Sequence, residues 1–172
     1  GALRVGERRC AKANLFAMEQ VQRLRPVVKI VAQAGGHNTV DWLRIAGRLL
    51  DLGSQHVLIV GPSPLWYPGL PRVFADHHLG DRPEYVSAGI ERSLFENDRL
   101  LGAKLAGIPN VTYVSLLDRL CRGEACLARV PGEGDLDLMA VDFGHLTPKG
   151  SAYVGQTVFK PYLDRCLRRE TE

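Results

Sequence analysis

Short apolar runs alternate with amphipathic stretches along this chain of 172 residues. Three runs are rich in aliphatic and β-branched residues and are bounded by glycine or proline, which predicts buried strands at 27–32, 56–60 and 111–114. Elsewhere apolar residues recur three or four positions apart, which predicts helices. The predicted helices are 14–24, a stretch around Trp42 to Leu50, a long helix marked by Val86, Ile90, Leu94, Leu101 and Leu105, and a last helix after His145 with a kink at Pro161.

The continuous apolar character of the strands predicts a parallel sheet with helices on both faces and right-handed crossovers. The predicted fold class is therefore α/β, with a doubly wound parallel sheet. Ligands bind such folds beyond the carboxyl ends of the strands. Three informative loops leave those ends, at 33–38, 61–66 and 142–145, and we expect them to meet at one cleft.

Composition indicates one ordinary globular domain spanning residues 1–172, with 45% hydrophobic and 24% charged residues. The net charge of +3 comes from scattered lysine and arginine, so we expect no nucleic-acid partner. No apolar run approaches the roughly 20 residues that span a bilayer, and the N-terminus shows no signal-peptide pattern. We therefore expect a soluble piece, whatever its parent protein is.

The four cysteines are too few for a disulfide-framework fold, and their spacing excludes a Cys-x-x-Cys zinc or redox motif. No metal and no cofactor are expected. Cys121 and Cys126 flank a short loop that contains glycine, which favours a disulfide and an oxidising compartment. Cys166 falls on the apolar face of the last helix and is predicted to be a buried thiol, whereas Cys10 has no evident local partner.

Candidate chemistry is concentrated at Asp142 and His145, three residues apart just before a predicted helix. This spacing lets a carboxylate and an imidazole on one short loop converge, so that the histidine takes a proton and the aspartate holds its tautomer. Such a pair can also be two solvated polar residues of a surface loop. The preceding apolar run 136–141 and the helix start at Thr147-Pro148 favour a positioned pair, half of a catalytic triad.

Two adjacent aromatic residues, Trp66 and Tyr67, lie among prolines in the loop after the second predicted strand. Such rings can form a wall on which carbohydrate stacks, or they can pack the loop onto the domain. We favour packing for both.

Three segments together resemble a known family. They are Asp142-Phe143-Gly144-His145-Leu146-Thr147, Gly36-His37-Asn38 after a strand, and Gly61-Pro62-Ser63-Pro64-Leu65-Trp66. They look like the SGNH (GDSL-type) hydrolase fold, a flavodoxin-like three-layer sandwich. More narrowly, they resemble the SGNH domains of bacterial membrane acyltransferases that O-acetylate cell-surface polysaccharides. The resemblance covers nearly the whole chain, but Thr39 stands where the family often has an aspartate.

The resemblance implies a role for each matching residue. His145 would be the general base that activates a serine, Asp142 would orient it and stabilise its imidazolium, and Asn38 would donate its amide to an oxyanion. From the sequence, Asn38 is equally suited to cap a helix beside Thr39, and His37 to be a satisfied loop histidine.

The family's nucleophile belongs to a Gly-Asp-Ser motif after the first strand, and the chain contains no Gly-Asp-Ser. We therefore expect the first strand and its serine to lie upstream. Ser63, between two prolines, and Ser151, in the first turn of a helix, are expected to be structural. Ser115, at the end of a strand, is the least implausible replacement. The chain alone is predicted to be inactive.

Two functions follow from the resemblance. One is a serine-dependent acyltransferase or esterase that transfers an acetyl group to, or hydrolyses it from, saccharide hydroxyls. The alternative is a non-catalytic domain of the same fold that binds glycan or a partner. The resemblance also implies an acylated saccharide or polysaccharide substrate, a membrane acyltransferase domain in the parent protein, and a periplasmic or other extracytoplasmic location.

Overall fold

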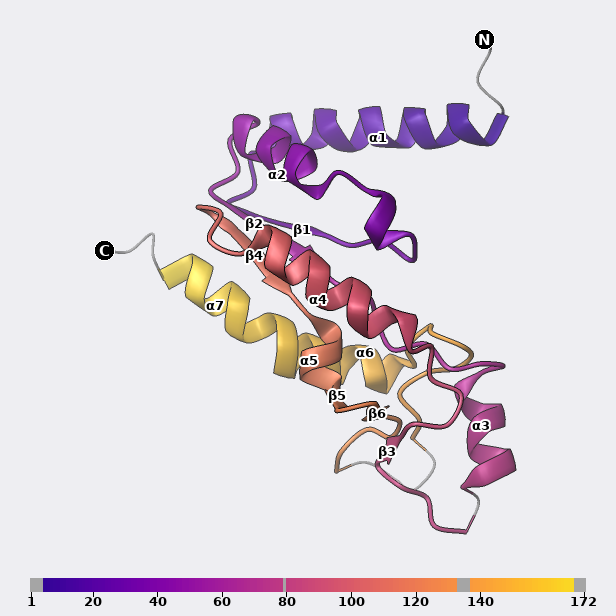
Figure 1. Cartoon of the computed structure of the whole chain (residues 1–172). Coiled ribbons are helices and arrows are strands. Elements are labelled where there is room, and N and C mark those ends of the chain that lie inside the picture. The colour runs from indigo at the N-terminus through magenta and orange to yellow at the C-terminus, as the bar shows by residue number, and fades with distance from the viewer. Residues whose placement is uncertain (1–4, 79, 133–136, 169–172) are drawn as a thin grey trace.

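A three-stranded parallel sheet forms the centre of the structure (Figure 1). The computed structural model describes residues 5–78, 80–132 and 137–168, and only the backbone of residues 5–10. The strand order is β1 (Val28–Val31), β2 (His56–Val60), β4 (Val111–Val114), with both pairings parallel. All three strands form where the apolar runs predict them.

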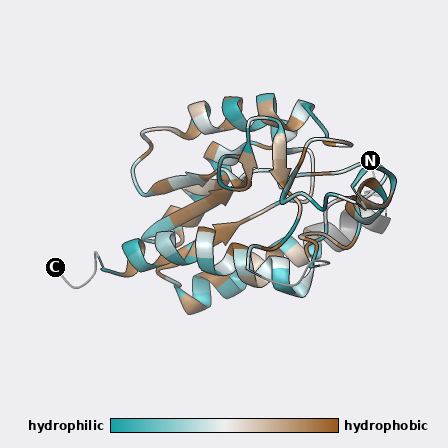
Figure 2. Ribbon diagram, turned by 90° about the horizontal axis from the view of Figure 1, so that it is seen from below, coloured by the Kyte–Doolittle hydropathy of each residue, from teal (hydrophilic) through white to brown (hydrophobic). Residues whose placement is uncertain are grey.

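Helices cover both faces of this sheet, as Figure 2, seen from below relative to Figure 1, shows. Successive side chains of a strand point to opposite faces, and both faces of β2 are buried. Val57 and Ile59 pack in one apolar cluster, Leu58 and Val60 in another. The first cluster includes side chains of α1 (Val5–Leu24), α2 (Trp42–Asp51) and α4 (Ser93–Leu105), and the second includes side chains of α6 (Pro148–Val154) and α7 (Lys160–Arg168). The doubly wound α/β fold is thereby confirmed.

The prediction of one long helix from Val86 is wrong at its start. Val86 belongs to β3 (Tyr85–Val86), and α4 begins only at Ser93. Between them Gly89 has a φ of 70°, which a right-handed helix excludes, and Ile90 forms an isolated β-bridge with Trp66. Val86 and Ile90 have helical spacing in the sequence, but β-type pairing with distant segments buries Val86 and leaves Ile90 partly buried against the same apolar cluster.

A small antiparallel sheet lies beyond the carboxyl end of β4 (Figure 1), in the order β3, β6 (Ala125–Leu127), β5 (Cys121–Arg122). The predicted disulfide between Cys121 and Cys126 is present and joins a directly paired position of β5 and β6. Cys166 is buried, as predicted, whereas the side chain of Cys10 lies outside the described part of the chain. Two short helices, α3 (Leu70–His77) and α5 (Leu116–Leu120), complete the fold.

The helix type changes just before Pro161, where the sequence predicts a kink. Residues Gly155–Phe159 form a π-helical turn between α6 and α7. Proline has no N–H, and its ring clashes with the carbonyl four residues earlier in a regular helix, so a wider turn before it relieves the conflict. In the described residues no helix combines the length and apolar character needed to cross a membrane.

Candidate functional site

Asp142 and His145 lie side by side in the structure. Asp142 Oδ2 is 2.7 Å from His145 Nδ1. The other carboxylate oxygen, Oδ1, accepts hydrogen bonds from the backbone N–H groups of Gly144 at 2.9 Å and His145 at 2.8 Å. The Gly144 bond, followed by those from His145, lowers the pKa of Asp142 to about 2. The carboxylate is therefore ionised at neutral pH and holds the proton of His145 on Nδ1.

With Nδ1 directed at Asp142, Nε2 is the basic nitrogen of His145. The His145 side chain is 73% exposed and that of Asp142 is 42% exposed, so Nε2 is open to a reacting group. The predicted pairing is thus present with the geometry that general-base chemistry needs.

A narrow hairpin-like turn carries the pair. Val141 N donates to His145 O at 2.8 Å, and Ala140 and Leu146 form a β-bridge. Immediately after the turn, the Thr147 side chain accepts from Gly150 N at 2.9 Å and caps α6. Local hydrogen bonds therefore fix both the turn and the helix that follows.

The loop after β2 anchors this turn to the sheet. Trp66 N donates to Phe143 O at 2.8 Å, and Leu70 N donates to Asp142 O at 3.0 Å. A Cβ atom at Gly144 would overlap the side chain of Leu65, so the two loops are in close contact. Because the 61–69 loop leaves the carboxyl end of β2, the pair lies near the sheet edge where the fold predicts a site.

The two aromatic residues of that loop have different surroundings. Trp66 is 1% exposed and belongs to the main apolar cluster, so the packing predicted for it is confirmed. Tyr67 is 52% exposed, so the same prediction is wrong for Tyr67. Neighbouring side chains of an extended segment point to opposite sides, and Trp66 occupies the inner side.

Asn38 and His37 belong to a single 3₁₀ turn, His37–Thr39, just after β1. Asn38 is exposed. The helix-capping alternative for Asn38 is wrong, because Asp41 caps α2 by accepting from Arg44 N at 3.1 Å. His37 is buried, and its Nε2 has no hydrogen-bond partner among the described residues, so it is not the satisfied loop histidine considered from the sequence.

A family model described as the SGNH domain fused to AT3 domains matches residues 2–160. The match spans most of the chain. The chain belongs to this SGNH domain family.

Among solved structures, the chain is similar to the periplasmic domain of a lipopolysaccharide acetyltransferase from Salmonella ser. Paratyphi A. The two are 22% identical, with a TM-score of 0.71 over 87% of this chain. The chain spans 62% of that domain's length. At this identity the likeness establishes the shared fold. No curated protein gives a significant match.

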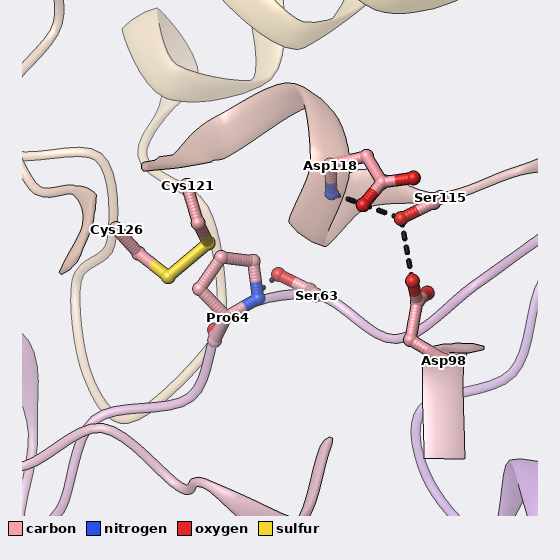
Figure 3. The surroundings of a disulfide bond; sticks show 7 residues. All are labelled: Ser63, Pro64, Asp98, Ser115, Asp118, Cys121 and Cys126. Atoms are coloured by element: carbon pink, nitrogen blue, oxygen red, sulfur yellow. Dashed lines mark hydrogen bonds between the residues drawn. A yellow bond between two sulfur atoms is a disulfide. The ribbon is translucent and has the colours of Figure 1, made fainter. Parts of the chain in front are cut away.

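No serine in the described part of this SGNH domain hydrogen-bonds to His145. Ser115 Oγ donates to Asp98 Oδ2 at 2.6 Å and accepts from Asp118 N at 2.9 Å, which caps α5 (Figure 3). Ser63 Oγ contacts the carbonyl of Pro64 at 3.4 Å, and Ser151 is exposed on α6. Ser115 is thus bonded as a structural residue, although the sequence made it the least implausible replacement nucleophile.

A buried carboxylate that the sequence pattern did not predict is Asp98, which is 5% exposed. Besides Ser115, Tyr113 donates its hydroxyl to Asp98 Oδ1 at 2.5 Å. Burial raises the pKa of Asp98 and, together with this hydrogen bond, that of Tyr113. A charged residue in the apolar stripe of Leu101 and Leu105 was the available signal. The network ties α4 to the carboxyl end of β4.

Metal chemistry has no evident centre in the described ranges, where no three His, Cys, Asp or Glu side chains gather as a metal site requires. The candidate site thus comprises the Asp142–His145 pair and the loop after β2 that holds it. Among the described residues, no hydrogen bond joins Asn38, on the turn after β1, to either member of the pair.

Proposed function

We propose that this SGNH domain supplies the His–Asp part of a serine-dependent site that moves an acetyl group to or from a saccharide hydroxyl. The short contact between Asp142 and the exposed His145 carries the proposal. His145 Nε2 takes the proton of a serine hydroxyl as the oxygen attacks the acyl carbonyl, and returns it to the leaving group. In the second half, His145 deprotonates the acceptor hydroxyl or water, which attacks the acyl-enzyme and releases the serine.

The serine in this proposal comes from a segment outside residues 1–172. Within the described residues β1 pairs only with β2, so its other edge can accept a further parallel strand. Ile30 on β1 is 47% exposed, and a cavity of about 810 Å³ lined largely by apolar side chains lies between α1, β1 and α2. Both features support strand addition at this edge.

The direction of that strand places its end near the site. Carboxyl ends of parallel strands share one edge of a sheet, so a nucleophile following the added strand would emerge beside the turn after β1. Asn38, exposed on that turn, would donate its side-chain amide to the oxyanion of the tetrahedral intermediate.

The proposed setting is extracytoplasmic. The family is fused to AT3 domains, the structural relative is a periplasmic domain of a lipopolysaccharide acetyltransferase, and the disulfide suits an oxidising compartment. We therefore propose a membrane acyltransferase domain as the covalent partner and a cell-surface saccharide as the substrate.

One observation favours a second candidate, a non-catalytic domain that binds glycan or a partner. The 172 residues contain no Gly-Asp-Ser, and Ser115 is bonded to Asp98. If no serine reaches His145 from elsewhere, the remaining chain retains a fold and a surface but lacks a nucleophile.

Hydrolysis of p-nitrophenyl acetate separates the candidates. We would compare the chain, the chain extended by the upstream coding sequence, and the His145→Ala variant of each. Activity only in the extended protein, abolished by His145→Ala, is the expected result. Turnover by the short chain that His145→Ala abolishes would show that an internal serine acts. An extended protein inert toward esters and saccharide acceptors would favour the binding domain.

A further inference from the structure

Two exposed aromatic rings lie next to the Asp142–His145 pair. Tyr67 is 52% exposed and Phe143 is 40% exposed, and their planes are nearly parallel, with an interplanar angle of 8° and ring centroids 6.1 Å apart. Rings in direct face contact would have centroids roughly 3.5–4.0 Å apart, so these two are not stacked directly face on face. We name Tyr67 and Phe143 the aromatic platform.

Backbone contacts hold both residues of the aromatic platform in place. Tyr67 N donates to Gly89 O at 2.7 Å, and Phe143 O accepts from Trp66 N at 2.8 Å. At Gly89 a Cβ atom would overlap the carbonyl of Tyr67, so the two segments approach as closely as glycine allows. A ligand that stacks on fixed rings loses little of its binding free energy to the ordering of the protein.

The platform leads directly to the proposed general base. The ring centroids of Phe143 and His145 are 5.7 Å apart, and the rings meet edge to face with an interplanar angle of 72°. A molecule of sugar size resting on Phe143 and Tyr67 therefore has its edge within reach of His145 Nε2.

We propose that the aromatic platform is a saccharide subsite, which binds the apolar C–H face of a pyranose ring and directs a ring hydroxyl toward His145. A pyranose is rigid and flat on this scale, with a C–H face suited to aromatic contact and hydroxyls at its rim that stay hydrated. That this sugar is the acyl acceptor rests on the proposed function. That a pyranose binds to the aromatic platform does not depend on it.

Binding is tested on the chain itself by saturation-transfer NMR. The probes are methyl β-D-galactopyranoside, methyl β-D-glucopyranoside and methyl α-L-rhamnopyranoside, with mannitol as a polyol that lacks a ring face. We expect saturation of the ring C–H protons of at least one pyranoside and none of mannitol. Tyr67→Ala should reduce this signal about tenfold. Tyr67→Phe should retain it, because stacking uses the ring face.

Phe16 provides the matched control, since it is also an exposed aromatic, 62% exposed on α1. Phe16→Ala should bind like the unmodified chain. Absence of saturation with all three pyranosides, or equal signals in Tyr67→Ala and Phe16→Ala, would overturn the subsite.

Kinetics of the extended protein test the acceptor assignment separately. Tyr67→Ala should raise the KM for the pyranoside acceptor about tenfold, with a smaller change in kcat. An unchanged KM would refute the acceptor role. If the extended protein transfers no acyl group while Tyr67-dependent pyranoside binding persists, the proposed function fails and the saccharide subsite stands.

Discussion

Gly150 supports the turn that carries the candidate site, and replacing it with alanine should destabilise the fold. It is buried in the first turn of α6. A Cβ atom there would overlap the carbonyl oxygen of Met139 and lie 3.1 Å from Thr147 Oγ1. That carbonyl accepts from Thr147 N at 2.9 Å, and Thr147 Oγ1 accepts from Gly150 N at 2.9 Å. The added methyl group therefore presses on both bonds that begin α6.

The expected loss of stability is the sum of two destabilising contributions and one stabilising contribution. Overpacking against backbone costs about 1–3 kcal/mol, and weakening one of the two hydrogen bonds costs about 1 kcal/mol. Alanine regains about 1 kcal/mol over glycine within a helix. The free energy of unfolding of Gly150→Ala should thus fall by about 1–3 kcal/mol.

Gly155 is the matched control. It is also helical, with a φ of −55°, and outside its own helix backbone and its chain neighbours no atom of the described residues lies within 4 Å of a Cβ built there. Gly155→Ala should gain the helical contribution alone, up to about 1 kcal/mol.

Urea denaturation followed by tryptophan fluorescence measures the difference, since Trp42 and Trp66 are each 1% exposed. In thermal unfolding, a change of 1 kcal/mol moves Tm by roughly 2–4 °C for a chain of this size. Tm should therefore fall by roughly 2–12 °C for Gly150→Ala and should not fall for Gly155→Ala. A Gly150→Ala variant as stable as Gly155→Ala would refute the steric reasoning.

Three further predictions concern the site and the buried network. Ser115→Ala should lower the free energy of unfolding, measured by urea denaturation, by about 1–3 kcal/mol, because it removes a helix cap and a donor to buried Asp98. The control Ser63→Ala should change it by less than about 0.5 kcal/mol. In the extended protein, Asp142→Asn should slow p-nitrophenyl acetate hydrolysis by up to about 10⁴-fold. The asparagine amide donates to Nδ1 and leaves the His145 proton on Nε2, the nitrogen that must act as the base. A loss of activity below about threefold would contradict this role of Asp142. Carbon-detected NMR should show Asp142 titrating near pH 2. Because the pKa of Asp142 is lowered in the folded state, the stability it contributes is complete above its unfolded pKa of about 3.9 and is lost as the pH falls through about 2. A titration midpoint near pH 4 would show that the backbone N–H groups do not stabilise the carboxylate.

The sequence predicts those parts of the fold and of the site that depend on a local pattern of residues or on a strand being buried on both faces. The three parallel strands are apolar at consecutive positions because helices cover both faces of the sheet. The Asp142–His145 contact was also predictable, because three residues of a tight turn separate the partners and the turn closes through hydrogen bonds of its own.

Features that depend on distant segments were beyond the sequence pattern. Val86 and Ile90 follow a helical period, yet each pairs with a distant segment. Val86 pairs with Cys126, and Ile90 forms a β-bridge with Trp66. The helix predicted at 14–24 is longer in the structure, where α1 begins at Val5. Which of Trp66 and Tyr67 is buried depends on how the loop pairs with residues 89–91, and a pattern of two adjacent aromatic residues carries no such information.

The Asp142–His145 pair is complete in its orientation without a serine. Its carboxylate is held by two backbone N–H groups, its imidazole by that carboxylate, and its turn by the loop after β2. In the proposed site, the segment that brings the nucleophile would become ordered by pairing with the edge of β1 that has no partner strand among the described residues. Since a preformed general base needs no rearrangement when the reaction begins, the activity of the extended protein should depend on strand pairing at β1 as strongly as on His145.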